Sequence, residues 1–214
     1  MSGIFCHKCI RRTHDLVYAV YVITKPTSEK IRSAARGLLT REGADAVTMR
    51  RVAEAVGITA MAVYRHYPNR AGLLNVLADE GFEDLATRLA GTRLKGGTDE
   101  KLERLMHVFV DHALENPRLF ELMFLKPREG ARQYPQDFKA GRSPTAGPTA
   151  QVLQEGMDSG YLREDDVWEI VFEMGALLQG LIMLYIGGRM AVTPTQFRSF
   201  CRRSFERYIH GIRK

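Results

Sequence analysis

The sequence predicts an all-α protein, with a small N-terminal unit of three helices and a larger C-terminal helical domain. Apolar residues recur at helical spacing from Pro26 almost to the end of the chain. Glycine or proline marks most of the breaks between these segments. Hydrophobic residues make up 45% of the 214 positions, which is enough for a packed core. The only strand considered is a short one over residues 17–23.

The first three expected helices are short and have clear start and stop signals. A residue that can cap a helix N-terminus precedes each of them, and glycine or proline follows each one. Their expected ranges are 27–42, 49–56 and 59–67. The paired start and stop residues are Thr27 or Ser28 with Gly43, Thr48 with Gly57, and Thr59 with Pro68.

The later helices are longer and are expected to build most of the core. Their expected ranges are 70–89, 98–116, 118–125, 149–159, 165–187 and 194–212. Four prolines and three glycines fall within residues 126–148, which predicts a long loop with at most one helical turn. We divide the chain into an unassigned tail (1–26), a helix-turn-helix domain (27–74) and a second domain (75–214).

Composition narrows the class of protein and its surroundings. The formal net charge of +6 favours a polyanionic partner, although a solvated basic surface gives the same total. Three cysteines do not form a regular disulfide framework, which favours a reducing cytoplasm. The apolar run 16–24 has no small-residue cleavage site typical of a secretory signal. The uncharged run 174–188 is too short for a membrane span and is expected in a core or subunit interface.

The segment from Thr48 to Tyr67 has the pattern of a helix-turn-helix. Ala53 is small enough to let two short helices cross closely, and Gly57 can adopt the positive φ of a tight turn between them. The apolar residues of the two helices provide a shared core. The second helix also carries polar and apolar side chains on a face that is not needed for packing. These signals agree on one local structure.

The stretch from about Ile31 to Leu74 resembles the DNA-binding domain of the tetracycline-repressor (TetR) family. The most specific part is the sequence VYRHYPNR over residues 63–70, followed by Leu73 and Leu74. It is similar to the end of the recognition helix in that family, where Tyr-x-His-aromatic leads through a polar turn to a basic residue. The close resemblance covers about a fifth of the chain, and the rest matches only in length and helical character.

The resemblance implies that this domain binds double-stranded operator DNA. Thr48 and Arg50 would contact phosphates or a base edge, and the start of the recognition helix would reach bases in the major groove. Ala60 and Met61 offer apolar contact to a thymine methyl group. The full set of implied DNA contacts is Thr48, Arg50, Thr59, Ala60, Met61, Tyr64, Arg65, His66 and Arg70. Residues 27–70 carry eight basic and four acidic side chains, which supports this function.

Each of these residues also has a plain structural interpretation. Tyr64 and Tyr67 are also consistent with a place in the core, and this is the expected role of Tyr67. Arg50 and Arg51 are also consistent with a solvated surface. Arg70 is expected to bind a phosphate beside the N-terminal amides of its helix. The joint spacing, rather than any single residue, favours DNA binding.

The resemblance also implies a homodimer formed by the last two helices and a small-molecule effector. A two-fold dimer matches a palindromic operator. The expected interface residues are Trp168, Phe172, Gly175, Leu178, Leu181, Ile182, Tyr185, Phe197, Phe205 and Tyr208. The residues expected to line an apolar effector pocket are Phe109, Phe120, Met123, Phe124, Phe138, Phe172 and Met183, although each one also fits an ordinary core.

Two other clusters were weighed as metal sites, and neither is favoured. Cys6, His7, Cys9 and His14 have zinc-like spacing but lack a second Cys-x-x-Cys, and the tail that holds them fits translation from an upstream start. Glu103, His107 and Asp111 share one helical face, for which a solvated surface is the simpler explanation. No catalytic motif is present, and no enzyme activity or cofactor is expected.

The sequence therefore predicts a cytoplasmic, ligand-responsive regulator of transcription, most simply a repressor that a small molecule releases from DNA. The alternative is a dimeric small-molecule-binding protein of the same fold that does not act at an operator. An enzyme is a distant third possibility.

Overall fold

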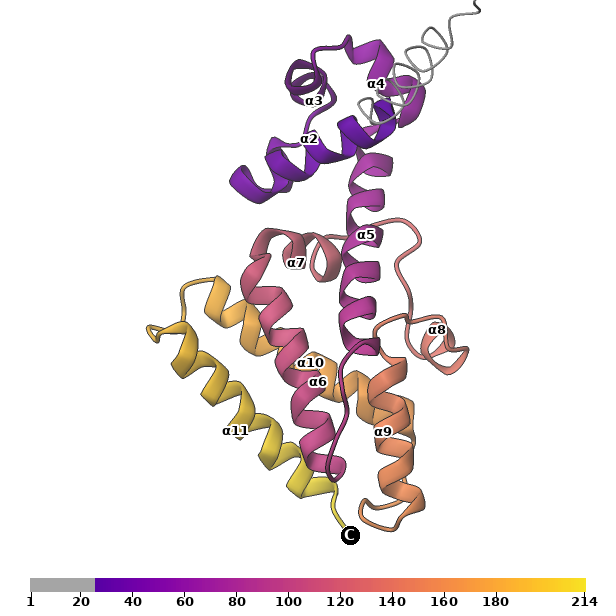
Figure 1. Ribbon diagram of the computed structural model, residues 1–214, viewed down its shortest axis with the longest axis vertical. Coiled ribbons are helices and arrows are strands. Elements are labelled where there is room, and N and C mark those ends of the chain that lie inside the picture. The colour runs from indigo at the N-terminus through magenta and orange to yellow at the C-terminus, as the bar shows by residue number, and fades with distance from the viewer. Residues whose placement is uncertain (1–25) are drawn as a thin grey trace, which may run out of the picture.

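A computed structural model of the chain describes residues 26–214. Regular structure within this range is helical apart from one isolated β-bridge between Leu162 and Arg213. The strand considered over residues 17–23 and the cluster that contains Cys6 and Cys9 lie outside the described residues. Figure 1 shows a small helical domain at one end, a larger one at the other, and a long helix joining them. The all-α prediction is confirmed for the described range.

The small domain consists of three helices and a short 3-10 turn. Its elements are α2 (Thr27–Glu42), η1 (Ala44–Ala46), α3 (Met49–Val56) and α4 (Ala60–His66). Thr48 and Thr59 cap α3 and α4 as predicted. The Thr48 hydroxyl accepts a hydrogen bond from the amide of Arg51 at 3.3 Å, and the Thr59 hydroxyl accepts one from the amide of Ala62 at 3.2 Å. The cap predicted for the first helix is wrong, since Pro26 occupies the N-cap position and no side chain caps α2.

The helix α5 (Arg70–Ala90) begins in the small domain and ends in the large one (Figure 1). It runs through the boundary expected between residues 74 and 75, and its buried residues belong to one core that extends through both domains. Leu73 is fully buried near its start, and Leu85 is fully buried near its end. Gly81 allows the helix α7 (Pro117–Phe124) to approach closely, because a Cβ at this position would lie 2.6 Å from the sulfur of Met123.

The large domain is arranged around α6. Its helices are α6 (Thr98–Glu115), α7 (Pro117–Phe124), α8 (Gln136–Lys139), α9 (Gly147–Asp158), α10 (Val167–Ile186) and α11 (Pro194–Ile212). The helices α5, α7, α9, α10 and α11 all contact α6. The short α8 lies in the expected loop and supplies the single helical turn allowed for it. Fully buried side chains such as Leu102, Phe120 and Phe197 form the centre of the domain.

Ion pairs and packing join the two domains near the middle of α5. Glu80 of α5 pairs with Arg32 at 2.9 Å and with Arg36, both on α2. Arg118 of α7 lies against Gly43 at the end of α2. The small domain is therefore held against α5 and α7 by polar contacts as well as by its core.

Candidate DNA-binding surface and effector cavity

The turn between α3 and α4 has the geometry of a helix-turn-helix. Gly57 adopts the left-handed conformation with φ +75° and ψ 36°, which a side chain would strain. The amide of Ile58 then donates to the carbonyl of Ala53 at 3.0 Å. Ala53 is only 3% exposed, since α4 packs closely over it. The small residue and the turn glycine act as the sequence predicted.

The helix α4 presents one face to solvent and one to the core. Val63 and Tyr67 point inward, and the Tyr67 hydroxyl donates to the carbonyl of Ser28 at 3.3 Å. Tyr67 is therefore a core residue, as expected. On the other face, Met61 is 69% exposed and Tyr64 is 44% exposed.

The polar side chains on this outer face have no role in the fold. Arg65 and His66 are exposed, and within residues 26–214 no hydrogen bond or ion pair engages Tyr64, Arg65 or His66. Arg50, at the start of α3, has a side chain that is 85% exposed, and its one partner is Glu54, one helical turn away at 3.1 Å. An exposed pair of this kind contributes little stability and yields easily to a phosphate. Ala60 is half-buried, so less of it is available to DNA than expected.

Arg70 is a structural residue in this conformation, contrary to its expected role as a free phosphate ligand. Its guanidinium donates to the carbonyls of Val47 at 2.7 Å and Ala44 at 2.6 Å. Asp45 lies 3.5 Å from the same group. Arg70 therefore ties the start of α5 to the segment before α3. Sequence spacing does not reveal this, since the three partners lie 23 to 26 residues away.

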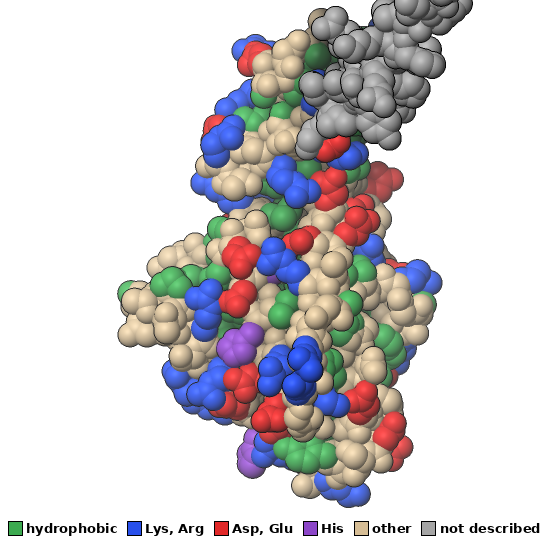
Figure 2. Space-filling view, viewed as in Figure 1, with side chains coloured by type: hydrophobic (Ala, Val, Ile, Leu, Met, Phe, Trp, Pro, Cys, Tyr) green, Lys and Arg blue, Asp and Glu red, His purple; other side chains and the backbone are tan. Residues whose placement is uncertain are grey.

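Arg51 also serves the fold. It forms two hydrogen bonds to the carboxylate of Glu42, at 2.7 Å and 2.8 Å, and this pairing raises the pKa of Arg51 and lowers that of Glu42. Figure 2 shows several Lys and Arg side chains on the visible face of the small domain. Fewer basic side chains are therefore free to bind DNA than the number of basic residues in the sequence indicated.

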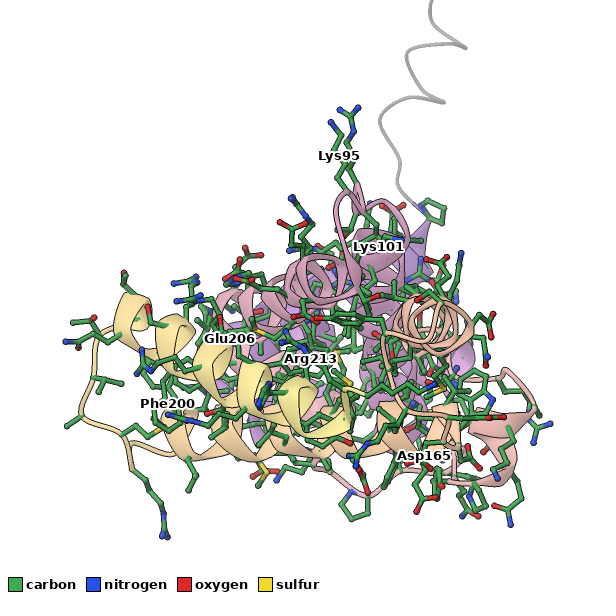
Figure 3. The ribbon with its side chains drawn as sticks, turned by 90° about the horizontal axis from the view of Figure 1, so that it is seen from below. Lys95, Lys101, Asp165, Phe200, Glu206 and Arg213 are labelled. Atoms are coloured by element: carbon green, nitrogen blue, oxygen red, sulfur yellow. The ribbon has the colours of Figure 1, made fainter. Side chains whose placement is uncertain are left out.

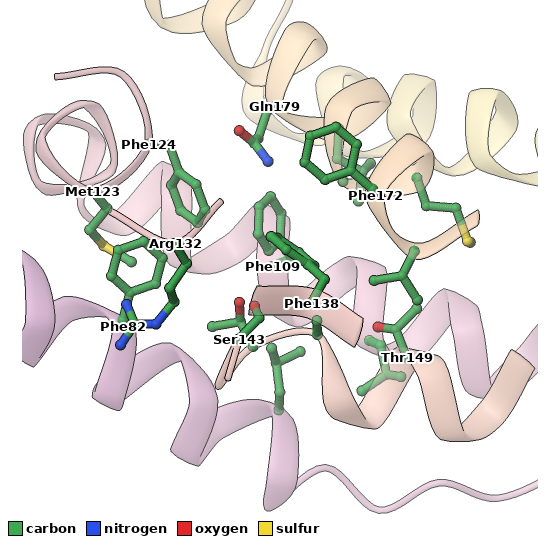
Figure 4. Close-up of a pocket in the computed structure, with 18 of the residues that line it drawn as sticks. Phe82, Phe109, Met123, Phe124, Arg132, Phe138, Ser143, Thr149, Phe172 and Gln179 are labelled. Carbon is green, nitrogen blue, oxygen red and sulfur yellow. The ribbon is translucent and has the colours of Figure 1, made fainter. Parts of the chain in front are cut away.

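A cavity of about 470 Å³ opens in the large domain between α5, α6, α7, α9, α10 and the long loop. This is the usual size of a small-molecule site. Five of the residues expected around an effector pocket line it: Phe109, Met123, Phe124, Phe138 and Phe172. Figure 4 shows their side chains arranged around the open space, with Gln179 pointing in from α10.

Two of the expected pocket residues lie elsewhere. Phe120 is fully buried behind the cavity wall, where its ring packs on Phe109 and Phe124 at centroid distances of 5.9 Å and 4.7 Å. Met183 is 47% exposed on the outer side of α10 and does not line the cavity. Periodicity places both residues on helices correctly, but it does not tell which face meets the cavity.

Several cavity residues were missed at the sequence level. Phe82 comes from α5, Gln179 from α10, and Ser143, Arg128 and Arg132 from the loop. Arg128 and Arg132 lie over the ring of Phe82, 5.2 Å and 5.4 Å from its centroid. The loop was predicted as a connector, and its proline and glycine content gives no signal that it folds back over a pocket.

Comparison with known proteins agrees with this geometry. Residues 31–77 match the family described as bacterial regulatory proteins, tetR family, and residues 102–211 match the tetracyclin repressor-like C-terminal domain. The second match alone covers half of the chain. The chain belongs to the TetR family. Its fold is therefore that of a TetR-family DNA-binding regulator, which confirms the resemblance seen in the sequence.

Individual relatives are distant from this TetR regulator. It is 30% identical over 103 residues to the nucleoid occlusion factor SlmA of Vibrio campbellii, covering 47% of this chain and 52% of that protein. It is 24% identical over 158 residues to the HTH-type transcriptional regulator YobS of Bacillus subtilis, covering 74% of this chain and 78% of that protein. The chain spans about half the length of the Vibrio campbellii relative and 62% of SlmA from Pasteurella multocida.

Solved structures show the same fold at low identity. A protein of unknown function from Rhodococcus sp. RHA1 matches with a TM-score of 0.72 and 22% identity, over 90% of this chain and 98% of that one. The TetR regulator PfmR of Thermus thermophilus matches with a TM-score of 0.60 and 19% identity, over 84% and 97% of the two chains.

The long helix α10 of this TetR regulator exposes apolar side chains. α10 is long and apolar enough to cross a membrane by composition, yet only 28% of its apolar window is buried within the subunit. Phe172, Met183 and Leu184 are each more than two-fifths exposed. Figure 3 views this end of the molecule and shows α10 and α11 lying side by side, with Phe200 on α11.

The interface predicted for α10 and α11 is only partly available in the TetR regulator. Leu178, Ile182, Phe197 and Phe205 are buried inside the subunit, so they cannot be interface residues as expected. Both helices are packed against α6 as well as against each other, and these side chains fill that core. The remaining predicted residues are exposed or half-buried: Trp168, Phe172, Gly175, Leu181, Tyr185 and Tyr208. Tyr208 donates to Glu173, and burial together with that carboxylate raises the pKa of Tyr208.

The cluster of Glu103, His107 and Asp111 on α6 is occupied by other partners. Glu103 lies 3.3 Å from His107, and Asp111 binds Arg198 of α11 at 2.5 Å. Among the described residues, no group of three or more His, Cys, Asp or Glu side chains could hold a metal ion. These side chains therefore form ion pairs on a partly exposed face of α6, where the sequence favours a solvated surface.

Proposed function

We propose that the protein represses transcription by binding a palindromic operator as a homodimer, and that a small molecule in the cavity releases it. One observation carries the DNA-binding half of this proposal. The outer face of α4 displays Met61, Tyr64, Arg65 and His66 with no partner inside the described chain. Phosphate contacts position such a helix, and the few side chains that reach base edges choose the sequence.

Dimerisation is supported by the exposed apolar surface of α10. A side chain such as Leu184 is costly to leave in water, and contiguous apolar surface on a soluble protein marks a contact site. A Cβ at Gly180 would meet no atom within 4 Å, so this position allows a partner helix to approach closely. Two copies joined here would give the two-fold symmetry of a palindromic operator, in the cytoplasm where such DNA is found.

The effector half of the proposal is supported by the cavity. Six phenylalanines and several polar groups surround a space that is wide enough for a drug-sized molecule. The long helix α5 contributes Phe82 to this cavity and also carries Glu80, which pairs with the small domain. A ligand that favours one position of α5 would thereby change how well the two recognition helices fit the operator.

The DNA-binding proposal is tested by selecting duplexes from a random pool with the full-length protein. We expect a palindromic sequence with half-sites about one helical turn apart, bound with a strong salt dependence. Arg65→Ala should weaken binding of the selected duplex by about ten-fold or more. Arg104→Ala is the matched control, because Arg104 is exposed on α6, far along the chain from α4.

The alternative function is that of a dimeric small-molecule-binding protein without an operator. The cavity favours it as well, since all of its lining residues lie outside the small domain. The selection experiment separates the two: if no duplex is preferred over random DNA while small molecules still bind, the repressor proposal is wrong.

A further inference from the structure

The charged residues that line the cavity all have the same sign. Among residues 26–214, Lys126, Arg128 and Arg132 are the only ionisable residues that line it, and no Asp, Glu or His joins them. The remaining walls are mainly apolar, with phenylalanine rings from α5, α6, α7, α8 and α10. An apolar space with cations and no acids suits a ligand that is hydrophobic over most of its surface and negatively charged at one end.

The two arginines are placed side by side at one end of the cavity. Both guanidinium groups lie over the Phe82 ring, and the side chain of Arg128 is only 8% exposed. Figure 4 shows Arg132 beside Phe82 and Met123, at the opposite side of the cavity from Thr149. A charge held in so dry a position interacts strongly with a second charge.

Within the described part of the chain, one carboxylate serves both arginines. Asp79 lies 2.9 Å from Arg128 but 4.0 Å from Arg132, and it stands outside the cavity lining. The Nε of Arg132 donates to the backbone carbonyl of Arg142 at 3.1 Å, which orients the guanidinium and leaves its terminal amino groups for another acceptor. The cavity therefore keeps an excess of positive charge within the described structure.

We propose that the effector is a hydrophobic organic anion whose single anionic group, a carboxylate or sulfonate, binds Arg132 and Arg128. The apolar body lies among Phe109, Phe124, Phe138 and Phe172, and Gln179 and Ser143 are placed to bond any further polar atom. A cationic ligand would meet like charges at this end of the cavity, and a neutral one would offer no opposite charge to the terminal amino groups of Arg132. This inference rests on the proposed function, since it assigns the chemical class of that effector.

The test uses full-length protein without DNA and a fluorescent anion, anilinonaphthalene sulfonate, as the probe. Two matched series compete with it: decanoate, decanamide and decylammonium, and naphthylacetate with its amide and the corresponding ethylammonium. In at least one series we expect the carboxylate to displace the probe about ten-fold more effectively than the amide. The amine should be the weakest competitor of the three.

Variants test whether this preference for the carboxylate arises in the cavity. Arg132→Gln should bring the carboxylate and the amide to within about two-fold of each other by weakening the carboxylate alone, and Arg132→Lys should restore part of the difference. Arg104→Gln removes an equal charge from an exposed site outside the lining and should change nothing. Circular dichroism confirms that each variant is folded.

The inference is overturned if the probe shows no saturable binding, if amides or amines compete as well as carboxylates, or if Arg132→Gln keeps the full preference. These results are independent of operator binding. A protein that selects a palindromic duplex but shows no anion preference contradicts this inference alone. A protein that prefers anions but selects no duplex contradicts the proposed function alone.

Discussion

The arginines of the small domain divide into two groups by what their side chains contact. Arg50 and Arg65 extend into solvent, whereas Arg51 and Arg70 bond to Glu42 and to backbone carbonyls. The sequence alone does not separate the two groups, because the arginines of both groups lie near the ends of helices. The division predicts that substitutions in the first group change DNA affinity and that those in the second change stability.

Arg70→Gln should destabilise the protein by about 1–3 kcal/mol, because it removes two charge-assisted hydrogen bonds from the carbonyls of Ala44 and Val47. The free energy of unfolding is measured by urea denaturation. Arg65→Gln is the matched control and should leave stability unchanged within about 0.5 kcal/mol while weakening DNA binding. Equal stability of the two variants would contradict the structural role of Arg70.

His112 gives the large domain a dependence on pH. It is fully buried on α6, neither ring nitrogen makes a hydrogen bond within the described residues, and Asp84 lies 3.4 Å from Nε2. Burial lowers the pKa of His112 below its usual 6.5, against a smaller opposing effect of Asp84. The folded state thus binds its proton less readily than the unfolded state does, so stability is full above about pH 6.5 and falls as the pH drops below it.

The His112→Gln variant should therefore lose less stability between pH 7 and pH 5.5 than the unaltered protein does. Urea denaturation at several pH values gives the two slopes. The difference between them cannot exceed about 1.4 kcal/mol per pH unit, the value for one proton. Parallel slopes would show that His112 titrates alike in the folded and unfolded states.

Among the helices, α5 connects the cavity to the DNA-binding domain through two adjacent residues. Asp79 pairs with Arg128 beside the cavity, and Glu80 pairs with Arg32 and Arg36 of α2. An anion that binds Arg128 and Arg132 competes with Asp79 for them. Because Glu80 on the same helix binds α2, we expect a small movement of α5 to shift the recognition helix.

The Glu80→Gln variant tests how firmly α2 is held on α5. We expect hydrogen exchange of the α2 amides to rise by about two- to five-fold, because two partly exposed ion pairs are lost. Exchange in α11 should not change. Glu83→Gln removes an exposed carboxylate from the same helix and serves as the control, and faster α2 exchange in both variants would argue against a specific connection.

At the scale of the whole molecule, the apolar surface exposed on α10 is the feature that bears on assembly. Met183 and Leu184 near its end are each more than two-fifths exposed, and only 28% of its apolar window is buried within the subunit. Two copies of this face would bury apolar surface that a monomer exposes to water. The distance between the two recognition helices is then set by this contact, which lies far from the DNA.

Met183→Glu should shift the protein from dimer to monomer, since a carboxylate in an apolar contact is costly to bury. Sedimentation velocity measures the change, and operator affinity should fall with it by about ten-fold or more. Thr87→Glu introduces the same charge at an exposed position on α5 and should leave the dimer intact. A Met183→Glu variant that remains dimeric places the interface elsewhere.

The helices and their caps follow from local signals, and the sequence predicted most of them. Thr48, Thr59 and Gly57 act within a few residues of themselves, so their roles could be inferred without a tertiary structure. The first helix was the exception, since Pro26 takes the position expected for a capping hydroxyl. The candidate sites were less predictable, as Arg70, Phe120 and Met183 show, because their surroundings come from segments distant in the chain.

The sequence by itself determined the all-α class, the helix-turn-helix and the TetR resemblance, because each depends on spacing within one helix or turn. Only the tertiary structure decided which arginines remain free for DNA, which side of α10 is exposed, and that a proline-rich loop brings Arg128 and Arg132 to the cavity. Those outcomes depend on contacts between residues tens of positions apart. Helical periodicity shows that a face is apolar, but not what that face packs against.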